Sequence, residues 1–112
     1  NVMTYLVFQA AHEAARLARA SGLSEATLEE VTRAAGIMSD RMQSFFALVK
    51  LPEEARTSDA MQRLLSGHLS IAEKDLAAAL DLAQSSGAAL PATGECAERM
   101  AQIYGVERPE AS

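Results

Sequence analysis

Apolar residues recur along this chain at steps of three and four, the spacing of one face of an α-helix. The first such stretch covers residues 2–20 and ends before Gly22, since glycine commonly follows a helix. Its apolar positions are Leu6, Ala10, Ala14 and Leu17. Ser24 and Ser39 are suited to cap a second and a third helix, because a serine hydroxyl accepts from the first free backbone N–H groups.

The second helix places Leu28 and Val31 on its apolar face and stops at Gly36, and the third ends at Pro52. The apolar positions of the third helix are Met42, Phe45, Phe46 and Val49. The polar residues 52–59 are expected to form a loop or a short helical turn. A brief helix with Met61, Leu64 and Leu65 is expected to end near Ser66 and Gly67.

The clearest pattern covers residues 70–86, with Gly87 after its end. Its apolar positions are Leu69, Ala72, Leu76, Leu80 and Ala83. A last helix is expected over residues 92–104, and residues 107–112 resemble a frayed tail. No alternating strand pattern occurs, so the sequence predicts an all-α fold of about six helices in one domain, residues 1–112.

The composition supports closely packed helices. Hydrophobic residues make up 49% of the chain and aromatic residues 4%, so the core depends on Ala, Leu and Met. The formal net charge of −5 argues against nucleic acid or an anionic membrane as the main partner. Cys96 is the only cysteine, which excludes an intrachain disulfide and favours a small buried side chain in a reducing compartment.

The chain has no apolar run of the roughly 18 residues that span a bilayer, and no signal-peptide pattern. We therefore expect a cytoplasmic protein. The sequence begins at Asn1, without Met and inside a helical pattern, which leads us to expect a further segment before it.

Lys74 is the first candidate for a functional residue. Three alanines, Ala77, Ala78 and Ala79, follow it closely on the helix, so another group has room to approach its ammonium. The ordinary interpretation is a solvated lysine, with Asp81 on roughly the same face balancing the charge.

The histidines give no metal site. His12 and Glu13 are adjacent on a helix and point about 100° apart, and His68 has no second ligand at a suitable spacing. Glycine-rich phosphate-binding motifs are also absent from the sequence, so the chain alone does not form a nucleotide site.

Residues 27–39 resemble the helix-turn-helix of bacterial repressors, in which a glycine-containing turn precedes a recognition helix. Three features weigh against this alternative. The recognition segment would carry only Arg41 as a base, next to Asp40; the turn is one residue too long; and the chain is acidic.

A different resemblance covers nearly the whole chain. It is carried by Asn1, by Ala11, His12, Glu13 and Ala14, by Leu17 and Ala18, by Gly22 and Leu23, by Lys74, Asp75 and Leu76, by Ala79 and Leu80, and by Gly87, Leu90 and Pro91. In order and spacing these residues resemble the C-terminal domain of the β-hydroxyacid dehydrogenases. That family includes 3-hydroxyisobutyrate dehydrogenase and tartronate semialdehyde reductase and is related to 6-phosphogluconate dehydrogenase.

The resemblance implies a helical substrate and dimerisation domain whose N-terminal Rossmann domain is absent from this chain. The full enzyme would oxidise a small 3-hydroxy acid reversibly with NAD or NADP. In the family a lysine acts as the acid/base and an asparagine four residues later helps hold the substrate. The asparagine matches Asn1, so the catalytic lysine would precede this chain and the chain alone would be inactive.

The resemblance also implies that Lys74 contacts substrate and cofactor, and it brings Asp75 in as a further cofactor contact. A cation such as Lys74 would orient the carboxylate of the substrate. The sequence departs from the family at His68, where a phenylalanine is common, and across residues 38–67. The identity of the hydroxy acid and the choice between NAD and NADP depend on residues of the missing domain.

A homodimer is the expected assembly, since in the family this domain forms the dimer around its first helix. The alanines Ala10, Ala11, Ala14, Ala15 and Ala18 give that helix a surface that another helix can approach closely. The remaining alternative is a helical interaction module without catalytic function.

Overall fold

The computed structural model describes residues 1–107, and these residues form six α-helices and no strands. The helices are α1 (Val2–Ala20), α2 (Glu25–Ala34), α3 (Asp40–Val49), α4 (Glu53–Arg56), α5 (Asp59–Ser86) and α6 (Pro91–Tyr104). The predicted all-α class and number of helices are therefore confirmed. The tail predicted at residues 107–112 lies outside the described residues, apart from Glu107.

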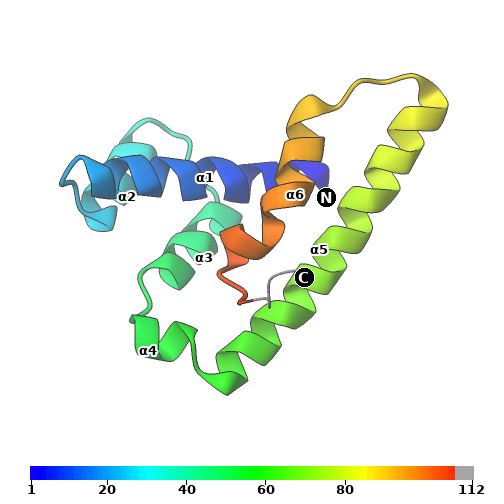
Figure 1. The fold of residues 1–112 in the computed structure, drawn as a ribbon. Coiled ribbons are helices and arrows are strands. Elements are labelled where there is room, and N and C mark those ends of the chain that lie inside the picture. The colour runs from blue at the N-terminus through cyan, green and yellow to red at the C-terminus, as the bar shows by residue number, and fades with distance from the viewer. Residues whose placement is uncertain (108–112) are drawn as a thin grey trace.

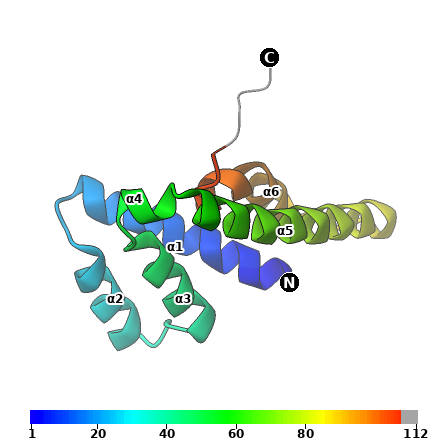
Figure 2. The ribbon, with the colours of Figure 1, turned by 90° about the horizontal axis from the view of Figure 1, so that it is seen from below.

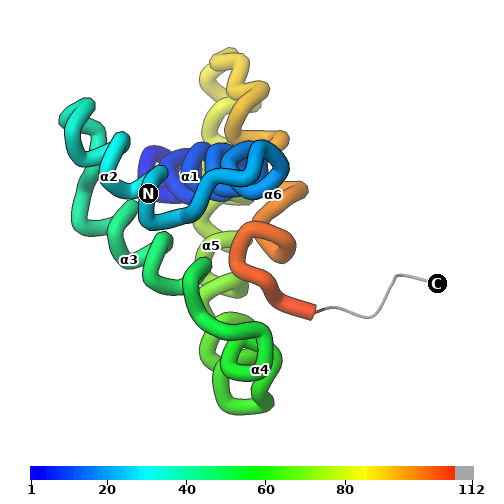
Figure 3. Tube along the Cα trace, turned by 90° about the vertical axis from the view of Figure 1, so that its left-hand side faces the viewer, coloured from blue at the N-terminus to red at the C-terminus, as the bar shows by residue number. Residues whose placement is uncertain are grey.

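Helix α6 lies between α1 and the long helix α5 (Figure 1). Helices α2 and α3 run side by side and pack on α1 (Figure 2). In a view along α1, α2 and α3 lie on one side of it and α6 on the other, while the short α4 leads into α5 (Figure 3). Helix α1 is therefore covered by neighbours over most of its circumference.

The core forms where α1, α3, α5 and α6 meet. The side chains with almost no exposed surface are Phe46, Leu69, Ala72, Leu76, Cys96 and Met100. Most apolar positions predicted for α3 and for the second half of α5 are buried, as expected, whereas Val49 and Leu80 are only partly buried. Cys96 is buried, as its interpretation as a small apolar side chain requires, and burial raises the pKa of its thiol.

Helix α1 buries a different face from the predicted one. Leu17 is 69% exposed, whereas Tyr5, Ala11, Ala15 and Ala18 are buried. Small side chains let the neighbouring helices approach the α1 backbone closely, so alanines rather than Leu17 lie in the contact. Leu6, also predicted, is partly buried against the core. Most of the alanine surface expected at a dimer interface is thus used inside the chain.

Serine caps fix three helix starts. The Oγ atoms of Ser24, Ser39 and Ser58 accept hydrogen bonds from the backbone N–H three residues later, at 3.1, 3.2 and 3.2 Å. The Ser24 and Ser39 caps confirm the sequence prediction. Gly87 ends α5 with a φ of 78°, a left-handed conformation that glycine adopts without strain.

The break predicted near Ser66 and Gly67 is wrong, because α5 is one continuous helix of 28 residues. A glycine inside a helix costs only about 1 kcal/mol relative to alanine. The burial of Leu65 and Leu69 on either side of Gly67 offsets that cost. The continuity of α5 brings His68 onto the same helix as Lys74 and Asp75.

Leu76→Ala is expected to lower the free energy of unfolding by roughly 2–5 kcal/mol, because Leu76 has no exposed surface and its removal leaves a cavity. Leu17→Ala, the same substitution at a site that is 69% exposed, is expected to change it by no more than about 0.5 kcal/mol. Urea denaturation of both variants measures the difference. Equal losses would contradict the placement of the core.

Candidate functional site

The start of α1 is hydrogen-bonded to the middle of α5. The side-chain Nδ2 of Asn1 donates to Oδ2 of Asp75 at 2.8 Å, and the hydroxyl of Tyr5 donates to the same oxygen at 2.8 Å. Asn1 and Tyr5 are four residues apart, so they project from the same side of α1. Two of the three residues singled out by the resemblance, Asn1 and Asp75, are therefore in direct contact.

The charge distribution of this cluster favours an ionised Asp75. The hydrogen bond from Asn1, followed by the one from Tyr5, lowers the pKa of the Asp75 carboxyl below its usual value. On the other side of the contact, burial and the hydrogen bond to Asp75 raise the pKa of Tyr5 to about 12. At neutral pH the cluster is thus a carboxylate held by two neutral donors.

Lys74, the third of these residues, lies apart from that contact. It is exposed, and Ala77 and Ala78 on the following turn are exposed as well, so its surroundings are as open as the sequence predicted. Neighbouring helical residues point about 100° apart, which turns the ammonium away from the Asn1 contact. Within the described part of the chain no salt bridge involves Lys74.

A groove of about 230 Å³ adjoins the Asn1 cluster. Its walls come from the start of α1, from α3, from α5 and from the end of α6. The lining residues are Asn1, Thr4, Tyr5, Phe8, Arg41, His68, Ile71 and Tyr104. The groove continues into a more apolar recess of about 330 Å³ that shares Phe8, Arg41, His68 and Tyr104.

Aromatic rings form the floor of this groove, and polar groups stand at its edge. The ring of His68 stacks on Tyr104 with centroids 6.4 Å apart, and Phe8 contacts Tyr104 edge-on at 6.0 Å. Arg41 and His68 are both exposed at the groove. A guanidinium beside aromatic walls is suited to hold a small organic anion by its carboxylate.

Three residues of this region were not assigned to a site from the sequence. Tyr5 was missed altogether. Arg41 was considered only as a DNA contact, and His68 only as a metal ligand, which was rejected, and as a departure from the family. Tyr5 had a signal in its spacing from Asn1, one helical turn. Arg41 had no such signal in the sequence, because only the packing of α3 on α1 brings it to the groove.

The described residues form neither a metal site nor a membrane-spanning helix. Among residues 1–107, no group of three or more His, Cys, Asp or Glu side chains is placed to hold a metal ion. No helix in that range has the length and apolar character needed to cross a membrane.

No family model, no curated protein and no solved structure matches this chain.

Asp75→Asn is expected to lower the pKa of Tyr5 from about 12, because the amide removes the negative charge that opposes phenolate formation. Burial, the largest cause of the shift, remains, so the pKa should stay above its usual value of about 10. Phenolate absorbance against pH measures it in a Tyr104→Phe background, which leaves Tyr5 as the only tyrosine.

The raised pKa of Tyr5 also determines how the folding stability of the chain depends on pH. The folded chain retains the Tyr5 proton up to a higher pH than the unfolded chain does. This contribution to stability is complete below about pH 10 and is lost as the pH rises towards 12.

As a control for Asp75→Asn, Asp81→Asn, at an exposed carboxylate of the same helix, should leave the Tyr5 titration unchanged. An unaltered Tyr5 titration in Asp75→Asn would contradict the assigned contact.

Proposed function

We propose that this chain is the C-terminal substrate and dimerisation domain of a cytoplasmic NAD(P)-dependent β-hydroxyacid dehydrogenase, with the helical fold of the 6-phosphogluconate dehydrogenase C-terminal domain. The proposal rests on the resemblance and is supported by one observation. Asn1 and Asp75, which lie 74 positions apart, share a hydrogen bond of 2.8 Å. The two segments that the resemblance assigns to the active site thus lie side by side.

In this proposal Asn1 holds the substrate at the start of α1, directly after the segment that would supply the catalytic lysine. Asp75 fixes the Asn1 side chain by accepting its Nδ2–H, which leaves the amide oxygen of Asn1 to accept from a substrate hydroxyl. In the full enzyme the upstream lysine would take the hydroxyl proton, and NAD or NADP, held mainly by the nucleotide-binding domain, would supply the hydride acceptor.

Lys74 has a role distinct from that of Asp75. Its exposed ammonium is available to the cofactor or the substrate carboxylate across the interface with the nucleotide-binding domain. Arg41 is a second cation, and it lines the groove beside Asn1. A small carboxylate with an apolar substituent suits a groove that combines this guanidinium with Phe8 and Tyr104.

The full polypeptide is expected to carry a lysine four residues before Asn1 and to reduce NAD or NADP with a small 3-hydroxy acid as substrate. Lys74→Ala in that polypeptide is expected to lower kcat/KM by roughly tenfold or more, because a charge-assisted hydrogen bond is lost. Peptide mapping of the native protein and nicotinamide absorbance measure the two expectations.

The chain offers a matched control in its other lysine. The ammonium of Lys50 lies 2.8 Å from Oε1 of Glu29, away from the Asn1 cluster, so Lys50→Ala should leave kcat/KM within about twofold. Turnover unaffected by Lys74→Ala would contradict the site assignment. Absence of the upstream lysine and of activity on all 3-hydroxy acids tested would overturn the proposed function itself.

The homodimer forms part of the same proposal, on a surface different from the alanine face of α1. Leu64, Ile71 and Leu82 are 56%, 59% and 67% exposed. At 3.6 residues per turn, spacings of 7 and 11 residues align all three within about 20° on α5. Ile71 also lines the groove and Leu64 its recess, so the partner subunit in this proposal would border the substrate groove. An exposed apolar stripe of this kind is typical of a protein interface.

We expect the chain to elute as a dimer in size-exclusion chromatography with light scattering, and Leu82→Glu to convert it to a monomer by placing a charge in the interface. Val31→Glu introduces the same charge at a site on α2 that is 60% exposed and should leave the dimer intact. A monomer at all micromolar concentrations would count against the dimer.

A further inference from the structure

A second cavity lies at the opposite end of α1 from Asn1. It measures about 60 Å³, is partly open to the surface, and is bordered by α1, α3, the short helix α4 and the end of α6. One water needs only roughly 10–15 Å³ of such space, so the cavity has room for a small polyatomic ion. Asn1 and Arg19 are 18 residues apart on one helix, a separation of about 27 Å. The cavity and the groove share Tyr104 as a wall, but the basic residues of the cavity lie outside the groove.

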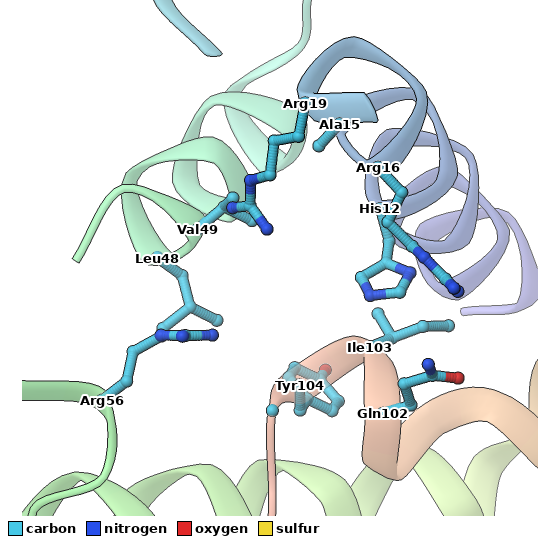
Figure 4. Close-up of a pocket in the computed structure, with 11 residues that line it drawn as sticks. His12, Ala15, Arg16, Arg19, Leu48, Val49, Arg56, Gln102, Ile103 and Tyr104 are labelled. Carbon is cyan, nitrogen blue, oxygen red and sulfur yellow. The ribbon is translucent and has the colours of Figure 1, made fainter. Parts of the chain in front are cut away.

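Basic side chains converge on the cavity. His12, Arg16 and Arg19 follow one another at steps of four and three on one face of α1, and Arg56 enters from α4. Figure 4 shows Arg19 and Arg56 extending towards the opening from two sides, with His12 across from them and Arg16 beside it. Three of the ten Lys and Arg residues thus surround one small cavity in a chain with a net charge of −5.

Among residues 1–107, the one salt bridge that involves these basic side chains joins Arg19 to Glu25. Arg19 pairs with Glu25 through its Nε, and its two terminal nitrogens remain available to another acceptor. The Nε of Arg56 is buried and has no hydrogen-bond partner among the described residues. A buried guanidinium donor without an acceptor is unfavourable, so the site is better satisfied with an anion bound.

His12 adds a donor that responds to an anion. Its imidazole is half-buried and contacts the edge of Phe45, with ring centroids 6.5 Å apart. Burial, followed by the positive charge of Arg16, lowers the pKa of His12 below its usual value. A bound anion would oppose both effects and change the electronic environment of the ring.

We propose that the cavity between His12, Arg16, Arg19 and Arg56 binds a phosphate group. Guanidinium groups match pairs of phosphate oxygens through parallel hydrogen bonds, and several of them together favour a compact dianion over a single carboxylate. The small, partly open volume of about 60 Å³ admits the phosphate group itself. The group is either inorganic phosphate or the phosphoryl end of a small metabolite.

The alternative explanation is structural. The guanidinium of Arg56 lies close to Gly105 at the C-terminal end of α6, where a positive charge stabilises the helix dipole. Under this explanation, removal of Arg56 lowers stability and the chain has no saturable affinity for phosphate.

The test is a titration of the isotopically labelled chain with inorganic phosphate at constant ionic strength, with the ring resonances of His12 as the readout. We expect a saturable shift at His12 and none at His68, the other histidine of the chain, which is exposed and outside this cavity. Isothermal titration calorimetry gives the same Kd independently. A titration with glycerol phosphate separates the two sources, since tighter binding of the ester identifies a metabolite.

Arg56→Gln is expected to weaken phosphate binding about tenfold or more, the effect of losing one charge-assisted hydrogen bond. Arg56→Lys retains the positive charge but lacks the paired donors of a guanidinium. Its Kd for phosphate should lie between those of the unsubstituted chain and Arg56→Gln. Arg33→Gln removes an exposed arginine of α2 outside the cavity and should leave the Kd within about twofold. If Arg56→Gln does not fold, Arg16→Gln, at an exposed position of the cavity rim, provides the comparison.

The absence of a saturable His12 shift would overturn the proposal. Equal weakening in Arg33→Gln and Arg56→Gln would also overturn it, because the binding would then be a property of the overall charge. An equal response of His12 to acetate would exclude a site selective for phosphate. None of these outcomes tests the proposed dehydrogenase function. That function depends on the Asn1 end of α1 and is tested by turnover of the full polypeptide.

Discussion

The packing of α6 between α1 and α5 is the contact on which the remaining structure depends. Cys96 and Met100 have no exposed surface, and Ile103 is 4% exposed, so one side of α6 is entirely covered. The opposing α5 contributes Leu69, which is 1% exposed, and Leu76, which has no exposed surface. Without α6, the two long helices would share few contacts, and burial of these side chains is the main source of their stability.

This packing also determines where the polar groups meet. With α6 between them, α1 and α5 approach each other at the start of α1, where Tyr5 and Asn1 reach Asp75. The other end of α1 diverges from α5 (Figure 1), and α2 and α3 pack beside it. The small cavity with His12 and Arg56 forms there. One helix thus contributes to the hydrogen bonds of a carboxylate at its start and to a basic cavity at its end.

The sequence was informative where structure depends on near neighbours. The Ser24 and Ser39 caps are interactions over three residues, so residue type and position predict them. Gly67 misled the prediction because its local helix propensity is poor while its neighbours Leu65 and Leu69 are buried by other helices. The buried face of α1 was missed for a similar reason, since the position of the partner helices decides which of its small side chains are buried.

The candidate site was predictable only in part. Asn1 and Asp75 came from the resemblance, and Lys74 also had a local signal in the alanines that follow it. Arg41 approaches the groove only through the packing of α3, and Arg56 joins the arginines of α1 only through the placement of α4. Neither position has a signature in the sequence around it, because a tertiary contact between distant segments leaves none in either segment alone.

Lys74 and Asp75 are adjacent in sequence but have different roles in the proposed enzyme, as the hydrogen bonds of Asp75 indicate. One carboxylate oxygen already accepts from both Asn1 and Tyr5, so its usual two acceptor positions are filled. A cofactor contact at that oxygen would have to displace a hydrogen bond that holds α1 to α5. Lys74 makes no such internal contact and is exposed. In the proposed enzyme Asp75 therefore orients Asn1, and Lys74 is the residue of the pair that meets the ligand.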